Sequence, residues 1–142
     1  MPEPAEASGD PGARTAGLRA AIVSQGIGVE YVEQLGGALG TSSGGRIQVV
    51  SGLQPASEFT VLVHEYAHEL LHRTGERPES RDTRELEAEA VAFVVGNAIG
   101  LDVTDAARDY IHLYRGDSAT LAESLGRIQR TAAVILTAVE TA

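Results

Sequence analysis

The stretch "LVHEYAHELLHR", residues 62–73, contains three of the four histidines of the chain. His64, His68 and His72 recur at every fourth residue, and Glu65 follows the first of them. On an α-helix, residues four apart lie on one face, so the rings of His64 and His68 can converge on one ion. Two imidazoles that hold Zn²⁺, with a neighbouring Glu as base, are the chemistry of the HExxH motif. The stretch predicts a metal-binding helix; the alternative is a solvated helix face rich in His.

A catalytic zinc needs a third protein ligand and leaves a fourth position open for water. His72 is one further turn along the same helix. With a rise of about 1.5 Å per residue, its ring lies too far from that of His64 for one ion to bind both. We therefore interpret His72 as a helix-end residue that interacts with the last backbone carbonyls.

The segment "TRELEAEAVAFVV", residues 83–95, offers three carboxylates as the third ligand. Glu85 and Glu89 share one helix face, whereas Glu87 points elsewhere and is predicted to belong to a charged surface. Glu89 lies beside the apolar run, so we expect it to sit deeper and to be the third ligand. Glu85 is expected to accept a hydrogen bond from the outer nitrogen of a ligand histidine, and it is the alternative third ligand.

The rest of the chain predicts an α+β fold with a small sheet and a helical body. Pro55 suits the first turn of a helix and Gly100 the end of one. Residues 1–14 are predicted to be a disordered tail, and residues 15–142 one domain. The segment 36–45 is predicted to be a loop. The expected elements are a helix over 16–25, strands near 29–34 and over 46–50, and helices over 55–72, 83–99, 102–114 and from 118.

Composition limits the class of protein. The chain has 142 residues and no Cys, which excludes disulfides and thiolate zinc sites and fits a cytoplasmic location. A formal net charge of −9 disfavours binding to nucleic acid. The N-terminal segment lacks the apolar run of a signal peptide, and the longest apolar stretches are too short to span a bilayer. The sequence does not indicate an oligomeric state.

The "HEYAHELLH" helix followed by "RELEAEAVAF" resembles the zincin-type metallopeptidase domain of the ArdC antirestriction family. It is also similar, more distantly, to the ImmA/IrrE regulatory metallopeptidases. The resemblance covers about residues 44–140 and extends to the lead-in strand and the C-terminal helix pair. It implies a zincin-like fold in which His64, His68 and Glu89 bind zinc and Glu65 is the catalytic acid/base. The single-stranded-DNA-binding domain that usually precedes this one in ArdC proteins has no counterpart in residues 1–43.

These observations predict a zinc metallopeptidase that hydrolyses peptide bonds in a peptide or protein substrate. The strand at 46–50 precedes the site helix and is expected to offer its edge to an extended substrate. Tyr110, with His112 and Tyr114 as weaker candidates, is considered as an oxyanion-stabilising residue. The alternative is a metal-stabilised module of an antirestriction or regulatory system that does not cut and acts with a DNA-binding partner.

Overall fold

The computed structural model describes residues 9–72, 81–101 and 118–141. Four helices accompany three short strands in these segments, which confirms the predicted α+β class. Gly9 lies against Leu101, and Pro11 is buried, so the described chain packs on the body before residue 15. The elements are α1 (Arg14–Ser24), β1 (Gly28–Val32), β2 (Gly40–Ser42), β3 (Arg46–Val50), α2 (Pro55–Leu71), α3 (Arg81–Ala98) and α5 (Ser118–Thr141).

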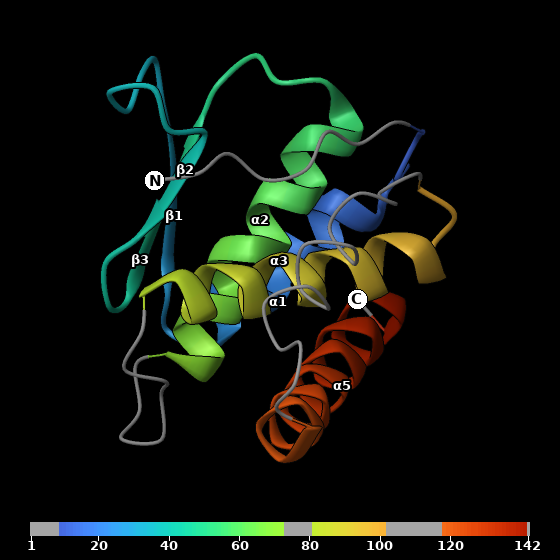
Figure 1. Cartoon of the computed structure of the whole chain (residues 1–142). Coiled ribbons are helices and arrows are strands. Elements are labelled where there is room, and N and C mark those ends of the chain that lie inside the picture. Colours follow the sequence, from blue (N-terminus) through green and yellow to red (C-terminus); the bar gives the residue numbers. More distant parts are fainter. Residues whose placement is uncertain (1–8, 73–80, 102–117, 142) are drawn as a thin grey trace.

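The sheet has the strand order β1-β3-β2 (Figure 1). β3 is central, because β1 pairs with it in parallel and β2 pairs with it antiparallel. The alternating Ile47 and Val49 of β3 are fully buried toward the helices. Two predictions were wrong here: part of the loop expected over 36–45 is strand β2, and β3 has no open edge for a substrate. Among the described residues, β2 is an edge strand of the sheet and lies beside α2.

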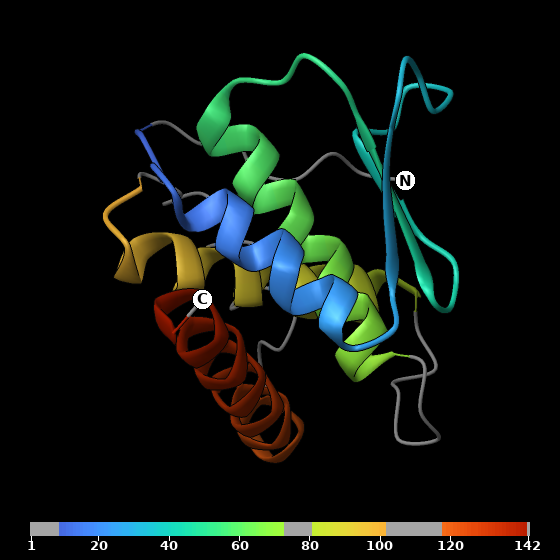
Figure 2. The same ribbon diagram turned by 180° about the vertical axis from the view of Figure 1, so that it is seen from behind.

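Helix α2 is the centre of the fold. Figures 1 and 2, which view the molecule from opposite sides, show α1 and α3 on opposite sides of α2, with the sheet beside it. Every residue from Phe59 to His68 is buried, as expected for a helix with neighbours on all sides. Pro55 occupies the first turn, where its missing N–H leaves no bond unmade. Polar side chains of α2 are therefore held inside the protein, where they need partners.

Helix α5 completes the body by packing against α1 and α3 (Figure 1). Its Ile128, Ala132 and Ile135 are buried at the helical spacing read from the sequence. The helix expected over 102–114, with the candidate oxyanion residues Tyr110, His112 and Tyr114, lies outside the described residues. None of the described helices combines the length and the apolar character required to cross a bilayer.

Candidate metal centre

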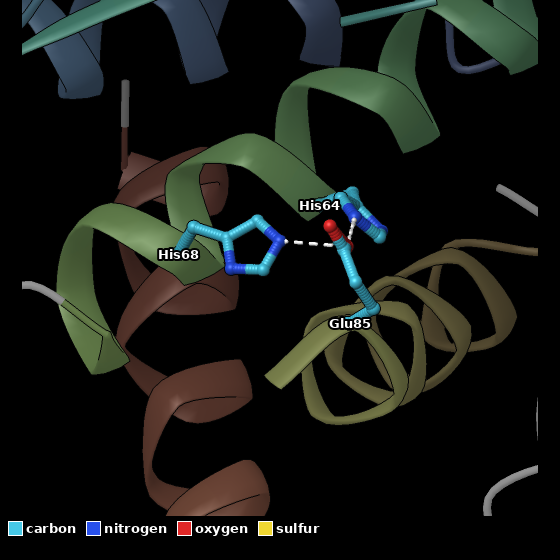
Figure 3. A group of neighbouring side chains, drawn as sticks. All are labelled: His64, His68 and Glu85. Atoms are coloured by element: carbon cyan, nitrogen blue, oxygen red, sulfur yellow. Dashed lines mark hydrogen bonds and ion pairs between the residues drawn. The ribbon is translucent and has the colours of Figure 1, made fainter. Parts of the chain in front are cut away.

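Two histidines of α2 and one glutamate of α3 meet in the interior (Figure 3). Nε2 of His64 and Nε2 of His68 each lie 3.0 Å from the same oxygen, Oε2 of Glu85. One ligand atom from each of the three residues lies within 4.8 Å of the others. Among the described residues, this is the group of His, Asp and Glu side chains that can hold a metal ion. Two imidazoles and one carboxylate are a donor set of catalytic zinc sites.

The structure brings Glu85, rather than Glu89, to the two histidines. Glu89 is half-buried one turn further along α3 and does not belong to the converging group. Glu89 lies beside the apolar run, but depth in that run does not determine closeness to the histidines. Position along the axis of α3 decides instead, since one turn moves a side chain by about 5 Å. The helix face shared by Glu85 and Glu89 identified the two candidate ligands. The choice between them depends on the packing of α3 on α2.

Electrostatics favour a neutral His64 beside an ionised Glu85. Burial lowers the pKa of His64, and the hydrogen bond with Glu85 opposes that shift only in part. Burial by itself raises the pKa of Glu85, but the interactions with His64 and His68 outweigh it and the pKa is lowered. Neutral imidazole and ionised carboxylate are the forms that bind metal ions.

His72 and Glu87 form a second layer behind this group, which the sequence did not reveal. His72 is buried, its Nδ1 lies 2.7 Å from Nδ1 of His68, and its Nε2 lies 3.0 Å from Oε1 of Glu87. Glu87 is fully buried, and its Oε2 accepts hydrogen bonds from Ser124 and Arg127 of α5. The predictions of a solvated Glu87 and of a His72 side chain that caps the helix were therefore wrong.

The pKa values of this second layer follow the same pattern. Burial lowers the pKa of His72, although the bond with Glu87 opposes the shift. Burial raises the pKa of Glu87, but hydrogen bonds from His72, Ser124 and Arg127 outweigh it, so the pKa is lowered. A sequence signal existed for His72, because it continues the spacing of His64 and His68. Glu87 gave none, since it is out of phase with Glu85 on α3.

The hydrogen bonds among the three histidines and two glutamates require more protons than neutral imidazoles supply. Four contacts join three imidazoles to two carboxylates: His64–Glu85, His68–Glu85, His68–His72 and His72–Glu87. Each hydrogen bond needs a proton, whereas three neutral imidazoles supply three and an ionised carboxylate supplies none. Neutral rings thus leave this network one proton short. A metal cation among His64, His68 and Glu85 removes the deficit, because it replaces two of the four hydrogen bonds; one additional proton on a ring removes it equally.

Glu65, the predicted base, lies on the side of α2 that faces strand β2. It is 1 % exposed. A Cβ built on Gly40 of β2 would come within 3.1 Å of Oε2 of Glu65 and 2.6 Å of Cγ1 of Val61. Only glycine allows β2 to approach α2 this closely. The position of the Glu65 carboxylate therefore depends on the edge strand.

The turn after β2 is tied to the same side of α2. The carboxylate of Glu69 accepts hydrogen bonds from the backbone N–H groups of Gly44 and Gly45, at 3.0 and 2.6 Å, and from the hydroxyl of Ser42. The side chains of Val61, Glu65 and Glu69 thus face the β2–β3 hairpin, while His64, His68 and His72 face α3. The sheet-facing row and the imidazole row are adjacent on α2, about 100° apart around its axis.

Substituting Gly40 with Ala is expected to lower the free energy of unfolding by about 1–3 kcal/mol, since the added methyl overpacks the contact with Val61 and Glu65. Gly28→Ala is the matched control, because a Cβ there would meet only the carbonyl oxygen of Gly45 at an ordinary 3.9 Å. Urea denaturation of both variants measures the difference. Equal stability of the two variants would contradict the close approach of β2 to α2.

Comparison of the chain with protein-family models, with curated proteins and with solved structures finds no significant match. The site's chemistry therefore has to be inferred from its residues.

Proposed function

We propose that this protein is a zinc-dependent peptidase in which His64, His68 and Glu85 bind the metal and Glu65 is the general base. The observation that carries the proposal is the convergence of two Nε2 atoms and one carboxylate oxygen, with Glu65 next to His64 on the same helix. The proton count is compatible with a metal cation at this point. The resemblance of the two helices to ArdC-type and ImmA/IrrE-type metallopeptidases implies the same reaction with Glu65 as base, but with Glu89 in place of Glu85 as the third ligand.

Zinc bound by these three residues would lower the pKa of a bound water toward neutrality and polarise a substrate carbonyl. Glu65 accepts the proton of the attacking water and then donates it to the leaving amine. Burial of Glu65 and His64 excludes bulk water and would strengthen the electrostatic interactions of the metal and of the Glu65 carboxylate. His68 and Glu85, 9 % and 8 % exposed, are the members of the site that reach solvent.

The proposed substrate is an extended peptide that adds to the edge strand β2. An exposed strand edge presents backbone N–H and C=O groups that pair with an added strand. β2 is bonded to β3 on one side and lies against Glu65 through Gly40. A peptide on the outer edge of β2 would therefore run beside the proposed base.

The direct test is metal analysis of protein purified without added metal, followed by incubation with a mixture of unfolded peptides and mass spectrometry of new termini. We expect one zinc per chain and cleavage that a chelator stops and zinc restores. Zinc-loaded protein that produces no new termini in such a mixture would exclude a general peptidase.

The burial of Glu65 favours a second candidate, a metal-stabilised module that does not cut. In that case zinc joins α2 to α3 as a structural bridge and any partner is bound elsewhere. Full zinc occupancy without hydrolysis, together with an unchanged function after Glu65→Gln, distinguishes this module from an enzyme.

Removing the metal is expected to lower the melting temperature, because the proposed ligands lie on two different helices. At free zinc 100 times the dissociation constant, binding stabilises the folded state by about 2.7 kcal/mol. Thermal unfolding with and without chelator measures the effect. The variant His64→Ala is the control, since its melt should no longer respond to chelator; an unchanged wild-type melt after verified zinc removal would contradict the bridge.

A further inference from the structure

The carboxylate of Glu87 is the fixed end of a buried path that leads to the metal-binding face of His68. On α5, Ser124 and Arg127 both donate to Oε2 of Glu87, which leaves Oε1 facing Nε2 of His72. The rings of His72 and His68 then meet through their Nδ1 atoms, with ring centroids 4.9 Å apart. Three helices thus contribute to one continuous set of contacts.

Donor and acceptor roles along this path follow from its fixed end. An ionised carboxylate only accepts hydrogen bonds, so Nε2 of His72 carries the proton. In the neutral ring, Nδ1 of His72 is then an acceptor, and Nδ1 of His68, 2.7 Å away, must donate. The proton of His68 is therefore on Nδ1, which leaves a lone pair on Nε2, the atom that faces Glu85.

We infer that Glu87 and His72 are positioning residues that hold His68 in the tautomer able to bind the metal, an inference that rests on the metal site of the proposed function. A metal-bound histidine usually donates a hydrogen bond from its second ring nitrogen directly to a carboxylate, a carbonyl or water. Here an imidazole is interposed, and Glu87 acts through it. The two ligand histidines are consequently unequal, since Nδ1 of His64 is buried with no hydrogen-bond partner among the described residues.

Glu87→Gln tests the polarity of this path. Ser124 and Arg127 are donors, so they select the amide oxygen of Gln and turn its NH₂ toward His72. Nε2 of His72 must then accept, its Nδ1 must donate, and the proton of His68 is displaced to Nε2, where it competes with zinc. We expect zinc affinity to fall by about 10–100-fold. The matched control is Glu89→Gln, which removes the same charge from the same helix outside this path.

Two measurements separate this role from a structural one. In zinc-loaded wild-type protein, ¹⁵N NMR should show the Nδ1–H tautomer of His68 and a scalar coupling across the hydrogen bond to Nδ1 of His72. After His72→Asn, the path is cut, so adding Glu87→Gln should weaken zinc binding no further. The His68 tautomer is read without any substrate, so absence of peptide hydrolysis alone leaves the inference intact.

Further outcomes of these measurements support or overturn the inference. An Nε2–H tautomer of His68 in the zinc-free variant Glu87→Gln supports it, whereas the Nδ1–H tautomer with unchanged zinc affinity contradicts it while the metal site stands. Equal losses of zinc affinity in the Glu87→Gln and Glu89→Gln variants would show that loss of charge alone weakens binding, which contradicts the inference. If wild-type protein binds no zinc, the metal site and this inference both fail.

Discussion

Glu65→Gln is expected to lower the rate of peptide hydrolysis by about 10²–10⁴-fold while zinc stays bound. The amide has nearly the size of the carboxylate but cannot take a proton from water. Because Glu65 is not one of the converging ligand residues, the zinc content should not change. Single-turnover rates and metal analysis on the same preparation measure the two effects separately.

The control for Glu65→Gln is Glu58→Gln on the same helix. Glu58 bonds to Arg19 and Tyr31 near the surface, so its loss should leave both rate and zinc content unchanged. A Glu65→Gln protein that cleaves at the wild-type rate would remove Glu65 from the mechanism. One that loses its zinc would instead place Glu65 among the groups that hold the metal.

The second large effect is the loss of zinc on Glu85→Gln. A neutral amide group would replace the charged carboxylate whose Oε2 lies 3.0 Å from Nε2 of both His64 and His68. The loss of affinity should exceed the roughly 10–100-fold typical of residues that only orient a ligand. His64→Ala and His68→Ala should remove zinc as completely. Competition titrations with a chromophoric chelator give the affinities.

Glu89→Gln is the comparison that decides the third ligand. Glu89 shares a helix face with Glu85, but it is outside the converging group, so its substitution should leave zinc affinity near that of the wild type. The reverse pattern, in which Glu89→Gln loses zinc and Glu85→Gln keeps it, would return the assignment to the one read from the sequence alone.

Much of the helical scaffold was predictable because its signals are local. Pro55 marks the start of α2, and Gly100 follows the end of α3. The spacing of His64 and His68 on one helix placed their rings together without any knowledge of packing. These predictions needed only the helical period and the preferences of Pro and Gly.

What the sequence could not show depends on contacts between helices. The choice of Glu85 depends on how far α3 is displaced along α2. Glu87 looked like a surface charge because its partners Ser124 and Arg127 are about 40 residues away on α5. β2 was missed because Gly40, Thr41 and Ser42 have turn-like composition, and pairing with β3 overrides that preference. Partners on other helices allow the carboxylates of Glu85 and Glu87 to lie in the interior.

The two rows of side chains on α2 make the length of this helix less tolerant of change than its composition. A residue inserted between Glu65 and His68 would rotate everything after it by about 100°. His68 and His72 would leave α3, and Glu69 would leave the β2–β3 hairpin, in a single step. Related chains should therefore exchange the buried apolar residues between these positions only for others of similar size, while insertions and deletions gather outside residues 61–72.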